Sequence, residues 1–331
     1  MPQQTVKIAI NGFGRIGRSI LRALLTSRRD MGIELVAIND IAALSSCAYL
    51  FQYDSIFGPY PGEVRHDAGH LIVDGRKIPF TRLPDISAAD FQGVDVLLEC
   101  TGAAGGRGGG QRALASGARR VLISGPADGA DATIVLGAND AQLADQAIVS
   151  NASCTTNALA PLVAQIDRLW GVQSGHMTTV HCYTGSQPTI DRPHDDLARS
   201  RAAALSMVPT TTSAGRLIGQ VLPHLAGRIE ARAIRVPTAS VSAIDLTVQT
   251  KRAADVDAVN AHFQTLAGTS DIFGWTTAPL VSTDLRGRPE SLIISGLETS
   301  LSQTGLLRIF GWYDNEWGFS NRMIDLALRM G

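Results

Sequence analysis

The first half of the chain alternates short, continuous apolar runs with segments of helical spacing. The apolar runs lie at 6–10, 34–40, 94–102, 119–126, 132–138 and 147–153. Between the first two runs, apolar side chains recur at helical spacing, at Ile20, Leu21, Leu24 and Leu25. Fully apolar strands separated by helices are typical of a parallel sheet covered on both faces. We therefore predict an α/β domain with a doubly wound parallel sheet.

The second half of the chain has a different pattern. Longer, alternating segments rich in β-branched residues lie at 176–184, 231–251, 276–285 and 291–296, and 256–268 has helical spacing. This pattern predicts an α+β domain with a mainly antiparallel sheet and helices on one face. We place the first domain at 1–153, with a C-terminal helix at 317–331 packing back on it, and the second domain at 154–316. The glycine-rich segment 103–111 is expected to be a loop.

Composition narrows the class of protein. A chain of 331 residues is long enough for about two domains, and its formal net charge of −1 gives no field that would attract nucleic acid or an anionic membrane. The four cysteines lack the spacing of a metal site, and their scatter suggests reduced thiols. No signal peptide or membrane span is evident. We expect a cytoplasmic protein with no metal and with neither a nucleic-acid nor a membrane partner.

A glycine motif near the N-terminus indicates a dinucleotide site. Gly12, Gly14 and Gly17 form G-x-G-x-x-G between a predicted strand and a predicted helix, and a second strand ends at Asp40. In this context the glycines allow a tight turn, close approach of the backbone to a pyrophosphate, and close helix packing. The Asp40 carboxylate would accept hydrogen bonds from the adenosine ribose and repel a 2′-phosphate, which favours NAD over NADP. The alternative is a glycine-rich turn that binds nothing.

The octapeptide SNASCTTN at 150–157 contains a candidate nucleophile, Cys154. Ser153 is a suitable N-cap, and the apolar spacing after it predicts a helix over 155–171. A thiol at a helix N-terminus is expected to have a lowered pKa and to react as a thiolate. The alternative, a buried structural cysteine, is less consistent with the small polar residues on both sides of Cys154.

His181 is the best candidate base for Cys154. In a strand at 176–184, alternation places His181 on one face with Thr179 and Tyr183. A neutral imidazole can accept a thiol proton and later exchange a proton with a substrate oxygen. The residues alone barely separate His181 from the other six histidines. Hydroxyl and guanidinium side chains at 184–186, 199–201, 210–212 and 235 suit phosphate, although ordinary loop chemistry explains them equally well.

Several of these runs together resemble phosphorylating glyceraldehyde-3-phosphate dehydrogenase. The matching segments span the chain and include INGFGRIGR, SNASCTTN, TTVHCYT, RVPTASVSAIDLT and WYDNEWGFSNRMID. The resemblance implies a Rossmann domain, an α+β catalytic domain, a homotetramer and NAD as cofactor. It also implies the reversible oxidative phosphorylation of glyceraldehyde 3-phosphate to 1,3-bisphosphoglycerate, in glycolysis or gluconeogenesis, through a thiohemiacetal and a thioester on cysteine.

The resemblance also implies roles for individual residues. Cys154 would be the nucleophile and His181 the base, while Asn315 would hold the nicotinamide carboxamide. The other cofactor-binding residues would be Gly12, Gly14, Arg15, Ile16, Gly17, Asp40 and Ser124. Thr184 and Arg235 would bind the substrate phosphate. Ser153, Thr155, Arg199, Thr212 and Ser213 would line a second site, for inorganic phosphate.

Some positions depart from the family pattern. Ser213 stands where members carry glycine, Ser186 where many bacterial members carry aspartate, and Ala158 where a second cysteine is usual. The glycine-rich loop replaces a stretch that includes an aromatic residue beside the adenine. Two alternatives therefore stay open: an erythrose-4-phosphate dehydrogenase, and a divergent, non-catalytic paralogue whose main role is binding. Retention of Thr184, Thr211 and Thr212 favours the triose phosphate enzyme.

Overall fold

The computed structural model describes residues 5–103 and 108–331. The chain forms two compact units. Unit 1 comprises Met1–Ile134, Ala141–Ala152 and Ser320–Gly331, and unit 2 comprises Val135–Asp140 and Ser153–Phe319. The chain thus passes from unit 1 into unit 2 at Ser153, one residue before Cys154.

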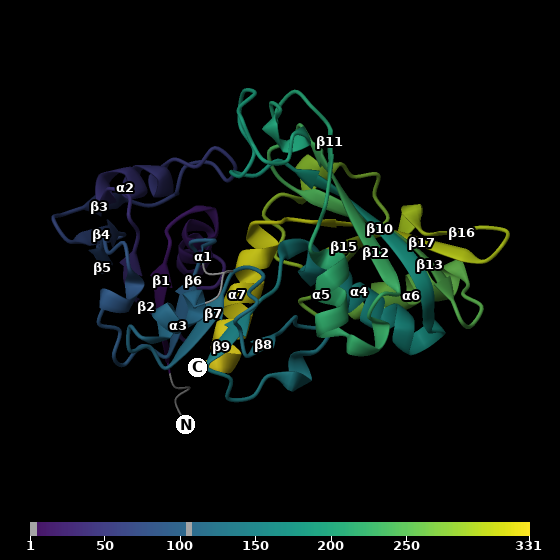
Figure 1. The fold of residues 1–331 in the computed structure, drawn as a ribbon, viewed down its shortest axis with the longest axis horizontal. Coiled ribbons are helices and arrows are strands. Elements are labelled where there is room, and N and C mark those ends of the chain that lie inside the picture. Colours follow the sequence, from purple (N-terminus) through teal and green to yellow (C-terminus); the bar gives the residue numbers. More distant parts are fainter. Residues whose placement is uncertain (1–4, 104–107) are drawn as a thin grey trace. The chain divides into compact units, whose positions relative to one another are not determined.

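Unit 1 contains a largely parallel sheet. Over the described residues the strand order is β3-β4-β5-β2-β1-β6-β7-β9-β8, with β1 paired in parallel to β2 and β6 (Figure 1). The strands are β1 (Val6–Asn11), β2 (Ile33–Asn39), β3 (Val64–His66), β4 (His70–Val73), β5 (Arg76–Thr81), β6 (Val96–Glu99), β7 (Arg120–Ile123), β8 (Ala132–Thr133) and β9 (Ile148–Ser150). The helices are α1 (Arg15–Leu25), α2 (Leu44–Gln52), α3 (Gly109–Leu114) and, from Ser320 onward, α7 (Trp317–Met330). The strand order reverses at β1, where open α/β sheets bind ligands.

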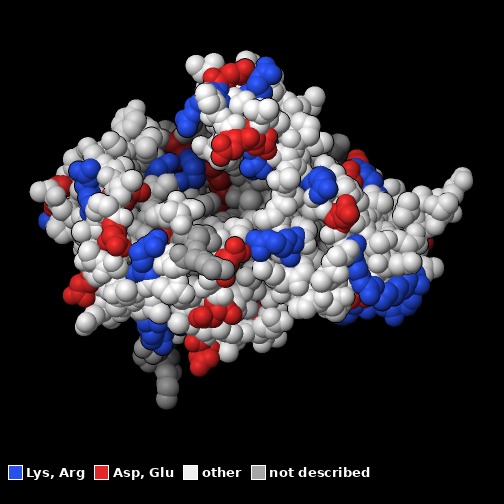
Figure 2. All heavy atoms as spheres, in the orientation of Figure 1, with Lys and Arg blue, Asp and Glu red and all other residues white. Residues whose placement is uncertain are grey.

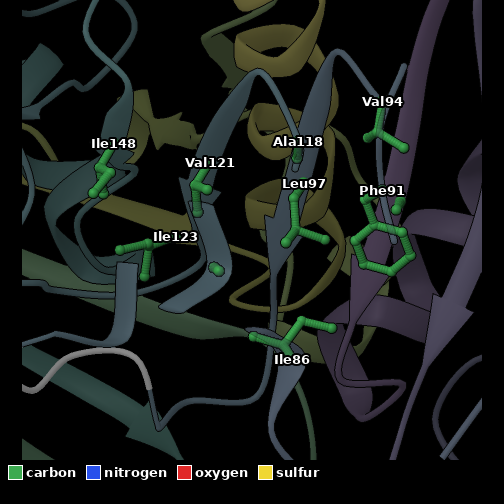
Figure 3. Close-up of a cluster of buried hydrophobic side chains, with 10 residues drawn as sticks. Ile86, Phe91, Val94, Leu97, Ala118, Val121, Ile123 and Ile148 are labelled. Carbon is green, nitrogen blue, oxygen red and sulfur yellow. The ribbon is translucent and has the colours of Figure 1, made fainter. Parts of the chain in front are cut away.

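A row of register partners forms the core on one face of this sheet. Leu97 on β6 lies opposite Ala9 on β1 and Val121 on β7, and Val121 lies opposite Ile148 on β9. Figure 3 shows Leu97 and Val121 with Phe91 and Ile86 in the same buried cluster. Because these side chains are almost completely buried, each contributes on the order of 1.5–3 kcal/mol to stability. The cluster includes Ala9 of β1, the strand that leads into the glycine turn, and so helps to hold that strand in place.

The end of the chain is part of unit 1. Arg28, just after α1, forms an ion pair with Asp325 of α7. Arg120 of β7 donates from one guanidinium nitrogen to the carbonyl of Met330, at 3.1 Å. Asp325 and Met330 of α7 therefore bind arginine side chains from much earlier in the sequence.

Unit 2 contains a mainly antiparallel sheet of order β11-β12-β10-β13-β17-β15-β14, with β16 paired to β17. Only β10–β12 and β14–β15 pair in parallel among its described strands. The strands are β10 (Val172–Cys182), β11 (Val208–Thr210), β12 (Ile229–Val236), β13 (Ser242–Thr250), β14 (Phe273–Thr276), β15 (Leu292–Ser295), β16 (Ser300–Leu301) and β17 (Leu306–Tyr313). Figure 1 shows the helices α4 (Cys154–Trp170), α5 (Ala214–Val221) and α6 (Val256–Ala267) on one side of this sheet. The predicted fold class, a parallel α/β sheet plus a mainly antiparallel α+β sheet, is confirmed.

Several local predictions were wrong. The run 132–138 yields only the two-residue strand β8. Of 276–285 only Thr276 lies in a strand, as the last residue of β14, because Pro279 interrupts the run and Ser282–Leu285 make a short 3₁₀ helix. The run 231–251 divides into β12 and β13. Of the expected loop at 103–111, residues 104–107 lie outside the described residues, and Gly109 begins helix α3. The other 3₁₀ helices span Ile86–Ala88, Asp140–Gln142, Ala198–Ser200, Pro223–Leu225 and Gly296–Glu298.

The surface carries charges of both signs. On the face shown in Figure 2, acidic and basic side chains both occur on each unit. Within the described residues, no helix combines the length and apolar character needed to cross a membrane. The same residues include no group of three or more His, Cys, Asp or Glu side chains placed to hold a metal ion.

Candidate active site

The glycine motif forms the turn between β1 and α1. Gly12 has φ +93°, and a Cβ there would lie 2.6 Å from the backbone nitrogen of Thr101. A Cβ on Gly17 would lie 2.3 Å from the carbonyl oxygen of Gly12, so only glycine lets the helix approach the turn this closely. Gly14 is exposed, and a Cβ there would have no atom within 4 Å. The turn therefore presents bare backbone at the start of α1, where a pyrophosphate would bind.

A cavity of about 720 Å³ opens beside this turn, within unit 1. Its lining residues are Asn11, Gly12, Gly14, Asn39, Asp40, Ile41, Leu83, Pro84, Asp85, Ile86, Glu99, Cys100, Thr101, Ala103, Gly109 and Arg112. The Asp40 carboxylate accepts hydrogen bonds from the backbone N–H groups of Phe13 (2.6 Å) and Ala42 (2.8 Å). These bonds fix the carboxylate at the cavity wall. The volume lies within the usual range for a cofactor site, and the glycine turn with its carboxylate fits a dinucleotide.

The floor of the cavity is a buried polar network that the sequence analysis missed. Asn39 accepts from the hydroxyl of Thr81 (2.8 Å) and donates to the side-chain oxygen of Asn11 (2.8 Å). Asn11 in turn donates to Glu99, which also accepts from the backbone N–H of Thr101 at 2.9 Å. Each of these residues ends or follows a strand of the sheet, and a polar residue at the end of an apolar run is the signal that could have found them.

The other predicted cofactor residues of unit 1 lie at the start of α1 and after β7. Arg15 and Ile16 are the first two residues of α1, and Arg15 forms an ion pair with Asp54 at 2.5 Å. Ser124 follows β7, and its backbone N–H donates to the carbonyl of Glu99 at 2.9 Å. Ser124 is not among the residues that line the cavity.

In unit 2, Cys154 is the first residue of α4, and Ser153 is its N-cap. The hydroxyl oxygen of Ser153 accepts from the backbone N–H of Thr156 at 3.1 Å, which ties down the first turn. Thr155 and Thr179 both lie within hydrogen-bond distance of the hydroxyl of Tyr313, at 2.8 and 2.9 Å. These bonds join the start of α4 to strands β10 and β17. The thiol is therefore presented from a fixed helix end.

His181 lies next to the Cys154 thiol. Its Nε2 atom is 3.7 Å from the Sγ of Cys154, and its ring packs edge-on against the ring of Tyr313. On the other side of the ring, Nδ1 is 2.7 Å from the carbonyl oxygen of Cys182 and 2.8 Å from a guanidinium nitrogen of Arg235. The Cys182 carbonyl can only accept a hydrogen bond and the Arg235 guanidinium can only donate one, so Nδ1 has a partner in either tautomer of the neutral ring. Nε2 is the ring nitrogen that faces the thiol. Arg235 donates to the same carbonyl at 3.0 Å.

The electrostatics of this pair differ from the sequence expectation. Burial, together with the positive charge of Arg235, lowers the pKa of His181 to about 4, so the ring is neutral near pH 7. Burial raises the pKa of the Cys154 thiol, and Arg235 and hydrogen bonds from Thr155 only partly oppose this effect. The expected lowering of that pKa by the helix N-terminus was wrong, because desolvation outweighs it. The resting pair is a thiol beside a neutral base.

The predicted phosphate residues form separate groups in the described structure. Arg235 on β12 lies opposite His181 in the register of the two strands. Arg199 donates through Nε to the hydroxyl of Thr210 at 2.6 Å and forms an ion pair with Asp196 at 3.3 Å. The hydroxyls of Thr184 and Ser186 are 3.0 Å apart.

The start of α5 carries the remaining two phosphate candidates. The Thr212 hydroxyl oxygen accepts from the backbone N–H of Ala214, at 3.3 Å. Ser213 has φ −73°, so its backbone does not require the glycine that the resemblance implies there.

Asn315 follows β17 and is buried. Its Oδ1 atom accepts from the Cys182 thiol at 3.1 Å and from the Ser242 hydroxyl at 3.3 Å. Four residues around this site have roles that were not predicted from the sequence: Cys182, Ser242, Thr179 and Tyr313. Tyr313 belongs to the motif WYDNEWG, so its position in that segment was a usable signal. The positions of the other three residues become meaningful only when β10, β13 and β17 are placed side by side.

A glycine-turn cavity for a dinucleotide, together with a thiol beside a neutral imidazole, characterises a nucleotide-dependent oxidoreductase that uses cysteine. Comparison with known proteins narrows this class. Residues 6–107 match the NAD binding domain of glyceraldehyde 3-phosphate dehydrogenase, and residues 153–315 match its C-terminal domain. The chain belongs to the glyceraldehyde-3-phosphate dehydrogenase family.

Individual relatives match along almost the whole chain. The glyceraldehyde-3-phosphate dehydrogenase of Xanthobacter flavus is 48% identical, over 99% of each chain. Those of Cereibacter sphaeroides and Pseudomonas aeruginosa are each 46% identical, over 99% and 98% of both chains respectively. The resemblance inferred from the motifs is therefore confirmed, and so is NAD as the cofactor of this family's N-terminal domain.

Proposed function

We propose that this protein catalyses the reversible, NAD-dependent oxidative phosphorylation of glyceraldehyde 3-phosphate to 1,3-bisphosphoglycerate. The observation that carries the proposal is the Cys154–His181 pair, with a neutral imidazole 3.7 Å from the thiol and Arg235 beside it. The names of the full-length relatives supply the substrate. The reaction would serve glycolysis or gluconeogenesis.

The first step uses the thiol and the base. His181 takes the proton of the Cys154 thiol on Nε2, and the resulting thiolate sulfur attacks the aldehyde carbon. The imidazolium then returns the proton to the oxyanion, which gives a thiohemiacetal and restores the neutral ring. A base whose pKa is about 4 returns this proton readily, because the charged ring is disfavoured in its buried site.

The second step is oxidation. Bound NAD supplies the acceptor for the hydride that leaves the thiohemiacetal carbon. His181 takes the hydroxyl proton as the carbonyl of the thioester forms on Cys154. Inorganic phosphate then attacks the thioester carbon, the C–S bond breaks, and the acyl phosphate leaves. The Cys154 thiolate recovers a proton from His181, so the site returns to its resting state.

The anion sites follow from the same assignment. We assign Thr184 and Arg235 to the substrate phosphate, since a guanidinium suits phosphate and Arg235 already lies beside the base. The inorganic phosphate is assigned to Ser153, Thr155, Arg199, Thr212 and Ser213. The first two of these flank Cys154 at the start of α4, where the helix dipole favours an anion.

The cofactor residues are assigned to separate parts of the cofactor. Gly14, Arg15 and Ile16 would meet the pyrophosphate at the turn that Gly12 and Gly17 shape. Asp40 would bind the ribose and Asn315 the nicotinamide carboxamide, and Ser124 is assigned to the cofactor site as well. Asp40 supports NAD over NADP, because its carboxylate at the cavity wall would repel a 2′-phosphate. We keep the division proposed above, with a cofactor domain at 1–153 plus 317–331 and a catalytic domain at 154–316.

We also propose a cytoplasmic homotetramer. Ile190, Leu197, Leu205 and Met207 are between 73% and 83% exposed, and they lie close together in the sequence. Large apolar side chains exposed in one segment are typical of a surface that another protein covers. The free thiols of all four cysteines are consistent with a reducing compartment. Light scattering coupled to size exclusion would give the mass of the assembly.

A matrix of substrates and cofactors tests the activity. Purified protein is assayed with glyceraldehyde 3-phosphate and erythrose 4-phosphate, with NAD and NADP, each with and without phosphate. The proposal requires fast, phosphate-dependent NADH formation from the triose phosphate. Rapid, phosphate-independent oxidation of the four-carbon sugar would instead identify the erythrose-4-phosphate enzyme, and no oxidation of either aldehyde would favour a non-catalytic paralogue.

A further inference from the structure

We propose that Cys182 is a positioning residue, which with Ser242 holds the Asn315 amide so that its NH₂ group can bind the nicotinamide carboxamide. The inference rests on the proposed function, in which Asn315 contacts that group. It assigns a task to a buried thiol that takes no part in the covalent chemistry. It also explains why the residue after the catalytic base is a hydrogen-bond donor.

The three residues meet at one end of the unit 2 sheet. Cys182 is the last residue of β10, Ser242 is the first of β13, and Asn315 follows β17 by two residues. The sheet order places β13 between β10 and β17, and these strands lie side by side in Figure 1. Strand pairing thus brings together three residues that are far apart in the sequence.

The hydrogen bonds of this group converge on the Asn315 amide oxygen. The backbone N–H of Cys182 donates to the Ser242 oxygen at 3.2 Å, which leaves the Ser242 proton available to donate in turn. That hydroxyl and the Cys182 thiol both donate to Oδ1 of Asn315, at 3.3 and 3.1 Å. Both groups thus contact the amide oxygen, and together they hold the amide with its NH₂ group on the opposite side.

The remaining end of the amide is available for a ligand. Among the described residues, the Nδ2 atom of Asn315 donates to no group, whereas its Oδ1 has two partners. An amide NH₂ is the group needed to donate to a carboxamide oxygen. Fixing its orientation before the cofactor binds removes an ordering cost from binding.

The thiol is suited to this task because it keeps its proton. Cys182 is 1% exposed, and burial raises the pKa of its thiol to about 12. The backbone of the same residue has a different role, since its carbonyl oxygen lies 2.7 Å from His181 Nδ1 and accepts from Arg235. Substitution of the side chain therefore removes the bond to Asn315 while leaving the anchor of the base in place.

Two variants of nearly equal volume separate hydrogen bonding from packing. Cys182→Ala removes the donor, whereas Cys182→Ser keeps an O–H in the same position. We expect the Kd for NAD, measured by calorimetry without substrate, to rise about threefold to tenfold in Cys182→Ala. In Cys182→Ser the Kd should return to within about twofold of the wild-type value. Equal weakening in both variants would overturn the proposal, and so would unchanged affinity in Cys182→Ala.

A spectroscopic test examines the bond without the cofactor. The S–H stretching band of Cys182 is located in the infrared as the difference between wild type and Cys182→Ser. A thiol that donates to a carbonyl oxygen absorbs at lower frequency than a free thiol, so Asn315→Ala should shift the band upward. Ser291→Ala, at a buried serine elsewhere in unit 2, is the control and should leave the band in place. A band that does not move in Asn315→Ala would refute the bond.

The same measurements distinguish a failure of the proposed function from a failure of the role proposed for Cys182. Failure of the wild type to bind NAD would refute the proposed function. Binding that is unaffected by Asn315→Ala would remove the role of Asn315, and the inference with it. If Asn315→Ala weakens binding but Cys182→Ala does not, the inference alone is wrong. In the Asn315→Ala background, Cys182→Ala should have no further effect, because Cys182 acts through Asn315.

Discussion

The depressed pKa of His181 predicts that acid destabilises unit 2 through this one side chain. The folded ring has a pKa of about 4, against 6.5 for an ordinary histidine. As the pH falls below about 6.5, the unfolded chain takes up a proton that the folded chain does not bind. The stabilising effect of the neutral, buried ring is complete above the unfolded pKa and is lost progressively as the pH falls toward 4.

The magnitude follows from the two pKa values. Between about pH 7.5 and pH 5, linkage predicts a loss of about 2 kcal/mol of unfolding free energy from His181 alone. His181 is 5% exposed, so water screens little of this effect. Carboxylates also titrate in this range, and a comparison of variants that share all of them removes their contribution.

The assay is urea unfolding at a series of pH values, followed by tryptophan fluorescence. Trp170, Trp275, Trp312 and Trp317 are all the tryptophans of the chain, and all lie in unit 2, so the signal reports the unit that contains His181. In His181→Gln, which cannot titrate, the loss between these pH values should be smaller by about 2 kcal/mol. The control is His176→Gln, at an exposed position on the same strand, and it should match the wild type. Equal pH dependence in His181→Gln and wild type would refute the reasoning.

Three further predictions concern the site. Cys154→Ser should abolish dehydrogenase activity and leave the Kd for NAD within about twofold, and normal turnover would exclude Cys154 as nucleophile. Gly12 has φ +93°, and a Cβ there would lie 2.6 Å from a backbone nitrogen, so Gly12→Ala should lower the free energy of unfolding by at least about 1–2 kcal/mol and weaken NAD binding. Thermal unfolding measures the first effect, and wild-type values for both would contradict this geometry. Arg235→Gln should raise the pKa of His181 in an NMR titration, since the guanidinium lowers it, whereas Arg232→Gln on the same strand should not. An unchanged titration in Arg235→Gln would refute that coupling.

Local patterns predicted the parts of the fold that depend on neighbouring residues. The helix after Ser153, the glycine turn and most strands of the parallel sheet were all recognisable from the sequence, because caps, glycine conformations and apolar runs act over a few residues. The run at 276–285 was wrongly predicted as a strand for the same reason, since its residues alternate as in a strand although Pro279 lies among them. Periodicity alone does not show whether a neighbouring strand is available for pairing.

The candidate site was predictable in its residues and less so in its energetics. Cys154 and His181 were singled out from motifs, yet the sequence suggested a lowered thiol pKa where burial raises it. Burial depends on what packs over a residue, and that comes from distant segments. The same limit applies to the bonds of Tyr313 with Thr155 and Thr179, which join positions more than a hundred residues apart. Nothing in local periodicity encodes such partners.

The division of the chain into two units also affects the order in which these units are completed during synthesis. Unit 2 ends at Phe319, whereas unit 1 needs Ser320–Gly331 to supply the partners of Arg28 and Arg120. Domains generally fold as units, beginning with the N-terminal one, as the chain leaves the ribosome. Here unit 1 emerges first but gains Ser320–Gly331 only after all of unit 2 has been synthesised. A nascent chain therefore contains all of unit 2 while Arg28 and Arg120 of unit 1 still lack these partners, so we expect the packing of unit 1 to be completed after that of unit 2.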